Sequence, residues 1–192
     1  TEIYTLSLHD ALPISYVDYT GRMVTGVNNF YVGMSSAAVP FTVSGGTCQL
    51  ESIAVALRPT NNEPLLVSLM SDNGGTPGSV IESMTISSGT LLALMYATSG
   101  IVTLDSMTHP TLQDGTAYWV AMEAASPDSD TTWCYGDPIL SGFTANNAGA
   151  GWFVYPSNIP ALQVTAVPEP LTLGLLAAGG LVVLSRRRRS IG

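Results

Sequence analysis

Apolar positions in this chain come in short runs that are rich in β-branched residues. Clusters of Gly, Pro, Asn and Asp separate the runs, and the densest cluster, DNGGTPG at residues 72–78, favours a tight turn. Short apolar runs bounded by such clusters are typical of strands. We therefore predict strands at residues 48–58, 65–70, 79–86, 101–104, 117–123, 152–155 and 161–166.

The run LLALMYA at residues 91–97 is ambiguous and is compatible with a short helix. Several short strands separated by turn signals favour antiparallel pairing in two sheets. The predicted fold class is all-β, an antiparallel β-sandwich or jelly-roll-like ectodomain followed by a C-terminal single transmembrane helix. We place the ectodomain at residues 29–166, after an N-terminal remnant at residues 15–28 and before a tail at residues 167–192.

The tail begins with a short proline motif, Pro168, Glu169 and Pro170, in which two prolines oppose a helix and favour an extended segment. An uncharged apolar stretch follows from Leu171 to Leu184. As a helix this stretch is about 21 Å long, short of the roughly 30 Å hydrocarbon core of a bilayer. Snorkelling basic side chains and local thinning of the bilayer can cover that difference. We therefore expect a membrane helix here.

A basic cluster follows the apolar stretch, and it consists of Arg186, Arg187, Arg188 and Arg189. Four arginines resist translocation and should stay on the cytoplasmic side of the membrane. A proline motif, a short apolar helix and a basic end, in this order, resemble the PEP-CTERM sorting signal over about the last 26 residues.

The PEP-CTERM resemblance implies a substrate of exosortase, a membrane-embedded transpeptidase or protease that cleaves near the proline motif. It also implies a Gram-negative host that makes exopolysaccharide or biofilm. The expected location is the inner membrane with a periplasmic ectodomain, and then the cell surface or the extracellular space after processing. The membrane pass is then single and transient.

Two further segments resemble the choice-of-anchor R domains. VSLMSDNGGTPG at residues 67–78 is similar to their SLYSDNGGxPG hairpin, and TAYWV at residues 116–120 is similar to their TYWL strand. The chain departs from the pattern at Met70, which replaces an aromatic residue, and at Ala117, which interrupts the second motif. The resemblance covers roughly residues 29–166 and implies a β-sandwich displayed through varied anchors. It brings no catalytic residues.

Residues 1–14 (TEIYTLSLHDALPI) resemble the in-frame translation of a sequencing adapter. They contain no initiator Met and no basic region before an apolar one, so they do not form a signal peptide. We expect them to be an artefact, with the natural start and any signal peptide upstream.

Charge excludes one class of partner. Only 10% of the residues are charged, against about 25% in an average protein, and there is no lysine. Residues 15–166 contain two basic and eleven acidic residues, which gives a formal charge of −9. Such a surface repels phosphate backbones, so we expect no nucleic-acid partner.

The sequence offers no catalytic constellation, metal site or cofactor motif, and we expect a protein that is not an enzyme. His109, the one histidine outside residues 1–14, is expected in a surface loop. Asp72 and the pair Asp128 and Asp130 supply oxygen atoms that suit calcium, but solvated turn residues are the favoured interpretation. A glycosidase-like carboxylate pair remains an open alternative.

Two cysteines, Cys48 and Cys134, are expected to form a disulfide in an exported protein, with buried thiols as the alternative. Four aromatic residues offer a possible sugar-stacking face, and they are Trp133, Tyr135, Trp152 and Tyr155. Core packing is the competing expectation for them, as it is for Trp119. These residues motivate a carbohydrate-binding module that serves exopolysaccharide as the alternative function.

Overall fold

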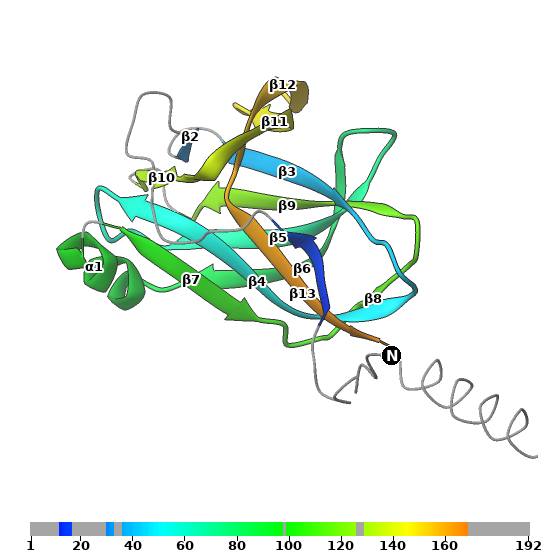
Figure 1. Cartoon of the computed structure of the whole chain (residues 1–192). Helices are drawn as coiled ribbons and strands as arrows, with labels where there is room; N and C mark the ends of the chain where they lie inside the picture. Colours follow the sequence, from blue (N-terminus) through cyan, green and yellow to red (C-terminus); the bar gives the residue numbers. More distant parts are fainter. Residues whose placement is uncertain (1–11, 17–29, 33–35, 98, 126–128, 169–192) are drawn as a thin grey trace, which may run out of the picture.

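The computed structural model describes residues 12–16, 30–32, 36–97, 99–125 and 129–168 (Figure 1). Within these ranges nearly all regular structure is β, arranged in two antiparallel sheets with one helix at the periphery. The expected all-β fold is therefore confirmed. The elements are β1 Leu12–Tyr16, β2 Phe30–Val32, β3 Ser36–Thr42, β4 Cys48–Pro59, β5 Leu65–Asp72, β6 Pro77–Ile86, α1 Ser88–Ala97, β7 Gly100–Asp105, β8 Thr111–Leu112, β9 Ala117–Ala124, β10 Thr131–Trp133, β11 Tyr135–Asn147, β12 Trp152–Pro160 and β13 Leu162–Pro168.

The first sheet has the strand order β12-β11-β3-β9-β5-β6. The second has the order β1-β13-β4-β10-β2, and β7 and β8 also pair with β4. Strand β4 is the central strand of the second sheet, because four other strands, β7, β8, β10 and β13, hydrogen-bond to it. The inner faces of the two sheets bury one shared apolar core in a sandwich-like arrangement.

Side chains alternate between the two faces of each strand, as the period of two requires. On β5, Val67 and Leu69 point into the shared core, whereas Met70 belongs to a separate cluster on the outer face of the first sheet. On β9, Val120 faces the core and Trp119 faces outward in the same way. The first sheet therefore carries apolar side chains on both faces.

All seven predicted strands are present, extended by a few residues at their ends. The ambiguous run at residues 91–97 belongs to helix α1. The Ser87 side chain caps the start of this helix by accepting a hydrogen bond from the Thr90 amide (3.3 Å), and Leu91 is buried against the core. The other six strands, β1, β2, β3, β8, β10 and β11, were not expected from the sequence.

The described part of the chain contains no helix of sufficient length and apolar character to cross a bilayer. The expected membrane helix and basic end, together with Glu169 and Pro170, lie outside the described residues, as do residues 1–11. Residues 12–16 form β1, which pairs with β13.

The two cysteines do not form the expected disulfide. Both carry thiols, and both are buried. Cys48 opens β4, whereas the amide of Cys134 donates to the carbonyl oxygen of Ala56, eight positions further along the same strand (2.8 Å). At about 3.3 Å per residue this separation is about 26 Å, far beyond the roughly 7 Å between Cα atoms that a disulfide allows.

Candidate functional site

The outer face of the first sheet is organised around a buried tryptophan. Trp119 on β9 is 2% exposed and packs with Met70 and with three alanines, Ala38, Ala121 and Ala145. Alanines on β3, β9 and β11 leave room for large rings to lie against the sheet. Trp152 on β12 packs against this cluster and remains partly exposed.

A hydrogen bond ties this cluster to the turn between β5 and β6. The indole nitrogen of Trp119 donates to Oδ1 of Asp72 (2.7 Å), and the amide of Gly75 donates to Oδ2 (3.0 Å). Both bonds lower the pKa of the Asp72 carboxyl, the tryptophan bond more strongly. Gly74 and Gly75 have φ of 66° and 88°, a conformation that favours glycine. The Asp72 carboxylate thus holds the turn in place and at the same time accepts the hydrogen bond of the Trp119 indole.

The hairpin of β11 and β12 forms one end of the molecule (Figure 1). Its pairing places Phe153 opposite Asn146, Tyr155 opposite Thr144 and Ser157 opposite Gly142. Paired residues share a face of a two-stranded ribbon, and residues two apart on one strand share it too.

Phe153, Tyr155 and Ser157 therefore form a row on one face of β12, which we call the aromatic strip. Phe153 is 64% exposed and Tyr155 is 37% exposed. Behind the strip lies Tyr135, the first residue of β11, which is 4% exposed. Burial and the neighbouring Tyr155 raise the pKa of Tyr135, and a hydrogen bond with Ser157 opposes that rise. The strip thus joins two exposed rings to a pair of hydroxyl groups.

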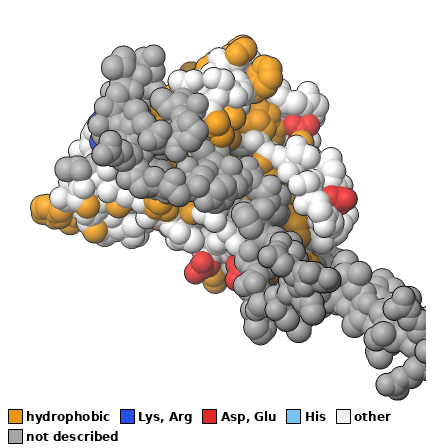
Figure 2. Space-filling view, in the orientation of Figure 1, with side chains coloured by type: hydrophobic (Ala, Val, Ile, Leu, Met, Phe, Trp, Pro, Cys, Tyr) orange, Lys and Arg blue, Asp and Glu red, His pale blue; other side chains and the backbone are white. Residues whose placement is uncertain are grey.

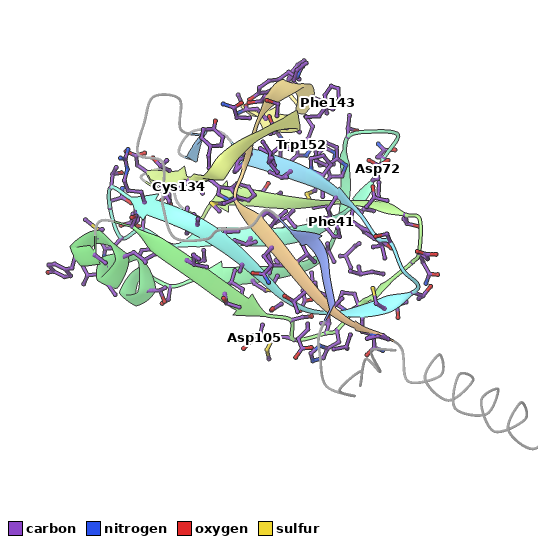
Figure 3. The ribbon with its side chains drawn as sticks, in the orientation of Figure 1. Phe41, Asp72, Asp105, Cys134, Phe143 and Trp152 are labelled. Carbon is purple, nitrogen blue, oxygen red and sulfur yellow. The ribbon has the colours of Figure 1, made fainter. Side chains whose placement is uncertain are left out.

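The opposite face of the hairpin carries Phe143, which is 57% exposed, together with Val154 and Trp152. Figure 3 shows Phe143 and Trp152 at the hairpin end of the molecule, away from Asp105. Hydrophobic side chains gather at this end in the space-filling view (Figure 2). No charged residue occurs between residues 140 and 160. Residues 140–160 of the hairpin therefore form an uncharged aromatic surface on an acidic protein.

The four aromatic residues singled out from the sequence do not form one surface. Trp133 is fully buried in the core and its indole donates to the carbonyl oxygen of Ala161 (2.9 Å), and Tyr135 is also a core residue. Core packing, the competing expectation, holds for these two. Trp152 is half-buried, and Tyr155 alone of the four is well exposed.

Phe143 escaped notice because residues 135–147 did not read as a strand. Phe153 lies in the predicted strand at residues 152–155 but was not singled out beside Trp152 and Tyr155. The signal that reveals them is an uncharged run, residues 140–160, in which aromatic residues recur beside amides and hydroxyls.

Glu82 on β6 is a buried carboxylate that holds the loop between β7 and β8. Its oxygens accept hydrogen bonds from the Ser106 hydroxyl (2.6 Å) and from the amides of Met107 (2.7 Å) and Thr108 (3.0 Å). Burial raises the pKa of Glu82, but these three donors outweigh it and hold the pKa below its usual value. These donors all belong to the loop between β7 and β8, so the role of Glu82 is structural.

His109 lies in the exposed loop where it was expected, with φ of 46°, and its Nδ1 is 3.0 Å from the carbonyl oxygen of Leu50. Among the described residues, no group of three or more His, Cys, Asp or Glu side chains is placed to bind a metal ion. Of the acidic residues considered for calcium, Asp72 binds Trp119 as above, and Asp128 lies outside the described residues.

The sequence matches no protein-family model and no curated protein. Among solved structures it is similar to the crystal structure of the cysteine protease and lectin-like domains of Cwp84, a surface layer associated protein of Clostridium difficile. The TM-score is 0.48 at 13% identity, over 70% of this chain and 32% of that chain. This chain therefore spans about a third of the Cwp84 chain, and so distant a likeness carries no argument about function. What the fold and the site define is an all-β domain of two sheets with an exposed aromatic hairpin at one end.

Proposed function

We propose that this chain is an exported, non-enzymatic protein of the bacterial envelope or extracellular matrix, sorted by exosortase through its C-terminal tail. It serves a matrix of exopolysaccharide or biofilm. The observation that best supports this proposal is the position of Pro168, which is both the last residue of β13 and the first residue of the proline motif.

The sheet ends where the motif begins. Strand β13 pairs with β4 throughout its length, and its last pairs are Val167 with Gln49 and Pro168 with Cys48. A protease that cuts after the motif therefore leaves β13 and the whole sandwich intact. Proline suits the end of a strand, because it has no amide hydrogen to continue the ladder.

The tail supplies the other requirements of the proposal. The uncharged stretch from Leu171 to Leu184 holds the chain in the inner membrane, and the four arginines that follow keep its end in the cytoplasm. The β domain then faces the periplasm until cleavage releases it toward the cell surface.

The test is the mass of the C-terminal peptide of the mature protein, produced in its own host. A peptide that ends near residues 168–170 supports processing. A mature chain that retains Arg186–Arg189 in a host with active exosortase overturns the proposal, and makes the protein a permanent single-pass membrane protein.

A motif variant makes this test specific. Glu169→Ala combined with Pro170→Ala alters the motif and leaves Pro168, which lies in the sheet, unchanged. We expect this variant to accumulate with its arginine end intact. The matched control is Ser190→Ala, beyond the basic cluster, which should be processed like the wild type.

A further inference from the structure

We infer that the aromatic strip on β12 is a binding surface for a neutral polysaccharide, and that Phe153 and Tyr155 are its principal contacts. This inference is independent of C-terminal processing. It rests on the exposure, the chemistry and the position of the hairpin.

The strip presents rings at a spacing that suits an extended ligand. Phe153 and Tyr155 are two residues apart on one face of a strand, so their side chains emerge about 7 Å apart. Both rings are open to solvent, at 64% and 37% exposure. A sugar ring presents an apolar C–H face that can lie flat on each aromatic ring.

Polar groups that can recognise sugar hydroxyls flank the rings. Ser157 continues the strip and shares a hydrogen bond with Tyr135, and Asn146 lies across the ribbon from Phe153. Hydroxyl and amide groups both donate and accept hydrogen bonds, as sugar hydroxyls do. The strip therefore combines apolar faces with neutral hydrogen-bonding groups and contains no charge.

The charge of the protein selects among polysaccharides. The chain has a formal charge of −8, and none of its charged residues falls between residues 140 and 160. A polyuronate would be repelled by the surrounding surface and would find no cation on the hairpin. A neutral polymer meets neither obstacle.

The edge position of β12 does not favour another strand as the occupant. β12 is the outermost strand of its sheet, and an exposed edge can template pairing with a second chain. Pro156 and Pro160 interrupt this edge, and proline has no amide hydrogen to offer an incoming strand. Side chains of the strip, rather than the backbone, are therefore the groups available for recognition.

The hairpin also lies at the end of the domain opposite the exit of the chain at Pro168, where a bound polysaccharide would not meet the tether. From Pro160 the chain passes through Ala161 into β13, which runs from its pairing with Val55 to the far end of β4 at Cys48 (Figure 1). The strip and the exit at Pro168 are thus at opposite ends of the molecule. A chain tethered through Pro168 holds the strip away from the tether.

The test is native-gel retardation of the full chain in polyoxyethylene-ether micelles, a detergent without sugar head groups. The probes are three soluble neutral polysaccharides, hydroxyethyl cellulose, dextran and galactomannan, with alginate as the acidic probe. We expect retardation by at least one neutral probe and none by alginate. Failure of all three neutral probes, or equal retardation by alginate, overturns the inference.

Variants locate the surface. Phe153→Ala and Tyr155→Ala should each weaken retardation on the order of tenfold, as expected for an anchoring aromatic residue. Tyr96→Ala, which removes an aromatic side chain that is 83% exposed on α1, is the matched control and should bind like the wild type. Equal urea midpoints establish that the variants fold.

Light scattering distinguishes a second copy of the chain as the occupant. One outcome is a dimer that Phe153→Ala converts to monomers, while retardation by the neutral polysaccharides stays the same. In that case the strip is a protein interface and the inference is wrong. Because the full unprocessed chain is used, a failure here says nothing against exosortase sorting, and a failure of sorting leaves this result unaffected.

Discussion

The indole of Trp119 donates a 2.7 Å hydrogen bond to Asp72, a residue 47 positions earlier in the chain. The bond joins the turn after β5 to the middle of the first sheet. Asp72 belongs to the DNGGTPG turn and Trp119 to the TAYWV strand. The two segments thus form one structural unit, a turn clamped to a tryptophan on the outer face.

Breaking this clamp should destabilise the domain. We expect Trp119→Phe, which keeps an aromatic ring and removes the donor, to lower the free energy of unfolding by roughly 1.5–3 kcal/mol, the usual range for a hydrogen bond to a charged group. Urea unfolding at pH 7 measures this change. The same exchange at Trp152, on the same face but away from Asp72, should cost less.

The clamp also predicts a pH dependence. Because the folded-state pKa of Asp72 is lowered, its contribution is full above the unfolded pKa of about 4 and is lost as pH falls through the folded value. The difference in stability between wild type and Asp72→Asn should therefore shrink below about pH 4. A difference that stays constant down to pH 2 would argue against an ionised carboxylate in this bond.

The Glu82 carboxylate should contribute more to the stability of the domain than the Asp72 carboxylate. Glu82→Gln keeps the shape but replaces one acceptor oxygen with a donor, so at least one of the Ser106, Met107 and Thr108 bonds is lost. We expect a loss of about 2–3 kcal/mol at pH 7. Like that of Asp72, this stabilisation is present above the unfolded pKa and disappears as pH falls through the lowered folded pKa. Glu51→Gln, an exposed glutamate on β4, is the control and should change the urea midpoint little.

One buried hydroxyl group should lower the stability of the domain. Within the described part of the chain, Oγ1 of Thr144 is buried without a hydrogen-bond partner. Thr144→Val has nearly the same shape and should raise the free energy of unfolding by about 1–2 kcal/mol, the cost of burying an unsatisfied hydroxyl. Thr60→Val is the contrast, because the Thr60 hydroxyl donates to the Asp130 carbonyl oxygen (2.7 Å), and it should lower stability.

The thiols give a chemical test of the fold. Cys48 and Cys134 are 8% and 4% exposed, and burial raises the pKa of Cys134 despite the opposing charge of Arg58. We expect a thiol reagent to label the native protein slowly and to label two sites per chain after unfolding. Reducing agent should leave the melting temperature unchanged. A mass lower by two hydrogens, with no thiol found after unfolding, would instead show a disulfide.

The strands that could be predicted from the sequence are those whose inward positions are large and apolar. In β4, Leu50, Ile53 and Leu57 form such a pattern because they fill the shared core. Strand β3 (SAAVPFT) escaped prediction because its outward position Ala38 must be small beneath the tryptophan cluster. Strand β11 escaped because it contains Gly, Pro and Asn, and it holds its place through pairing with β12 and β3 on either side.

The candidate site could be predicted only in part, for a related reason. Trp133 and Tyr155 are equally aromatic in the sequence, but exposure depends on strand partners that the sequence does not display. Trp133 lies in β10 between β4 and β2, whereas Tyr155 lies in an edge strand of the other sheet. The tendency of Trp152–Tyr155 to form a strand was visible, but the face that each side chain would occupy depends on a pairing partner, β11, that was not.

Strand β13 has a mechanical consequence. It lies between β1 and β4 and is antiparallel to both, and Pro168 is its end. A pull applied at Pro168 acts along the strand axis, so it loads the hydrogen bonds between β13 and β4 together in shear instead of opening them one at a time. Tension arising at the hairpin enters the same strand through Ala161. Force between the hairpin and the exit at Pro168 therefore passes along β13, parallel to the strand.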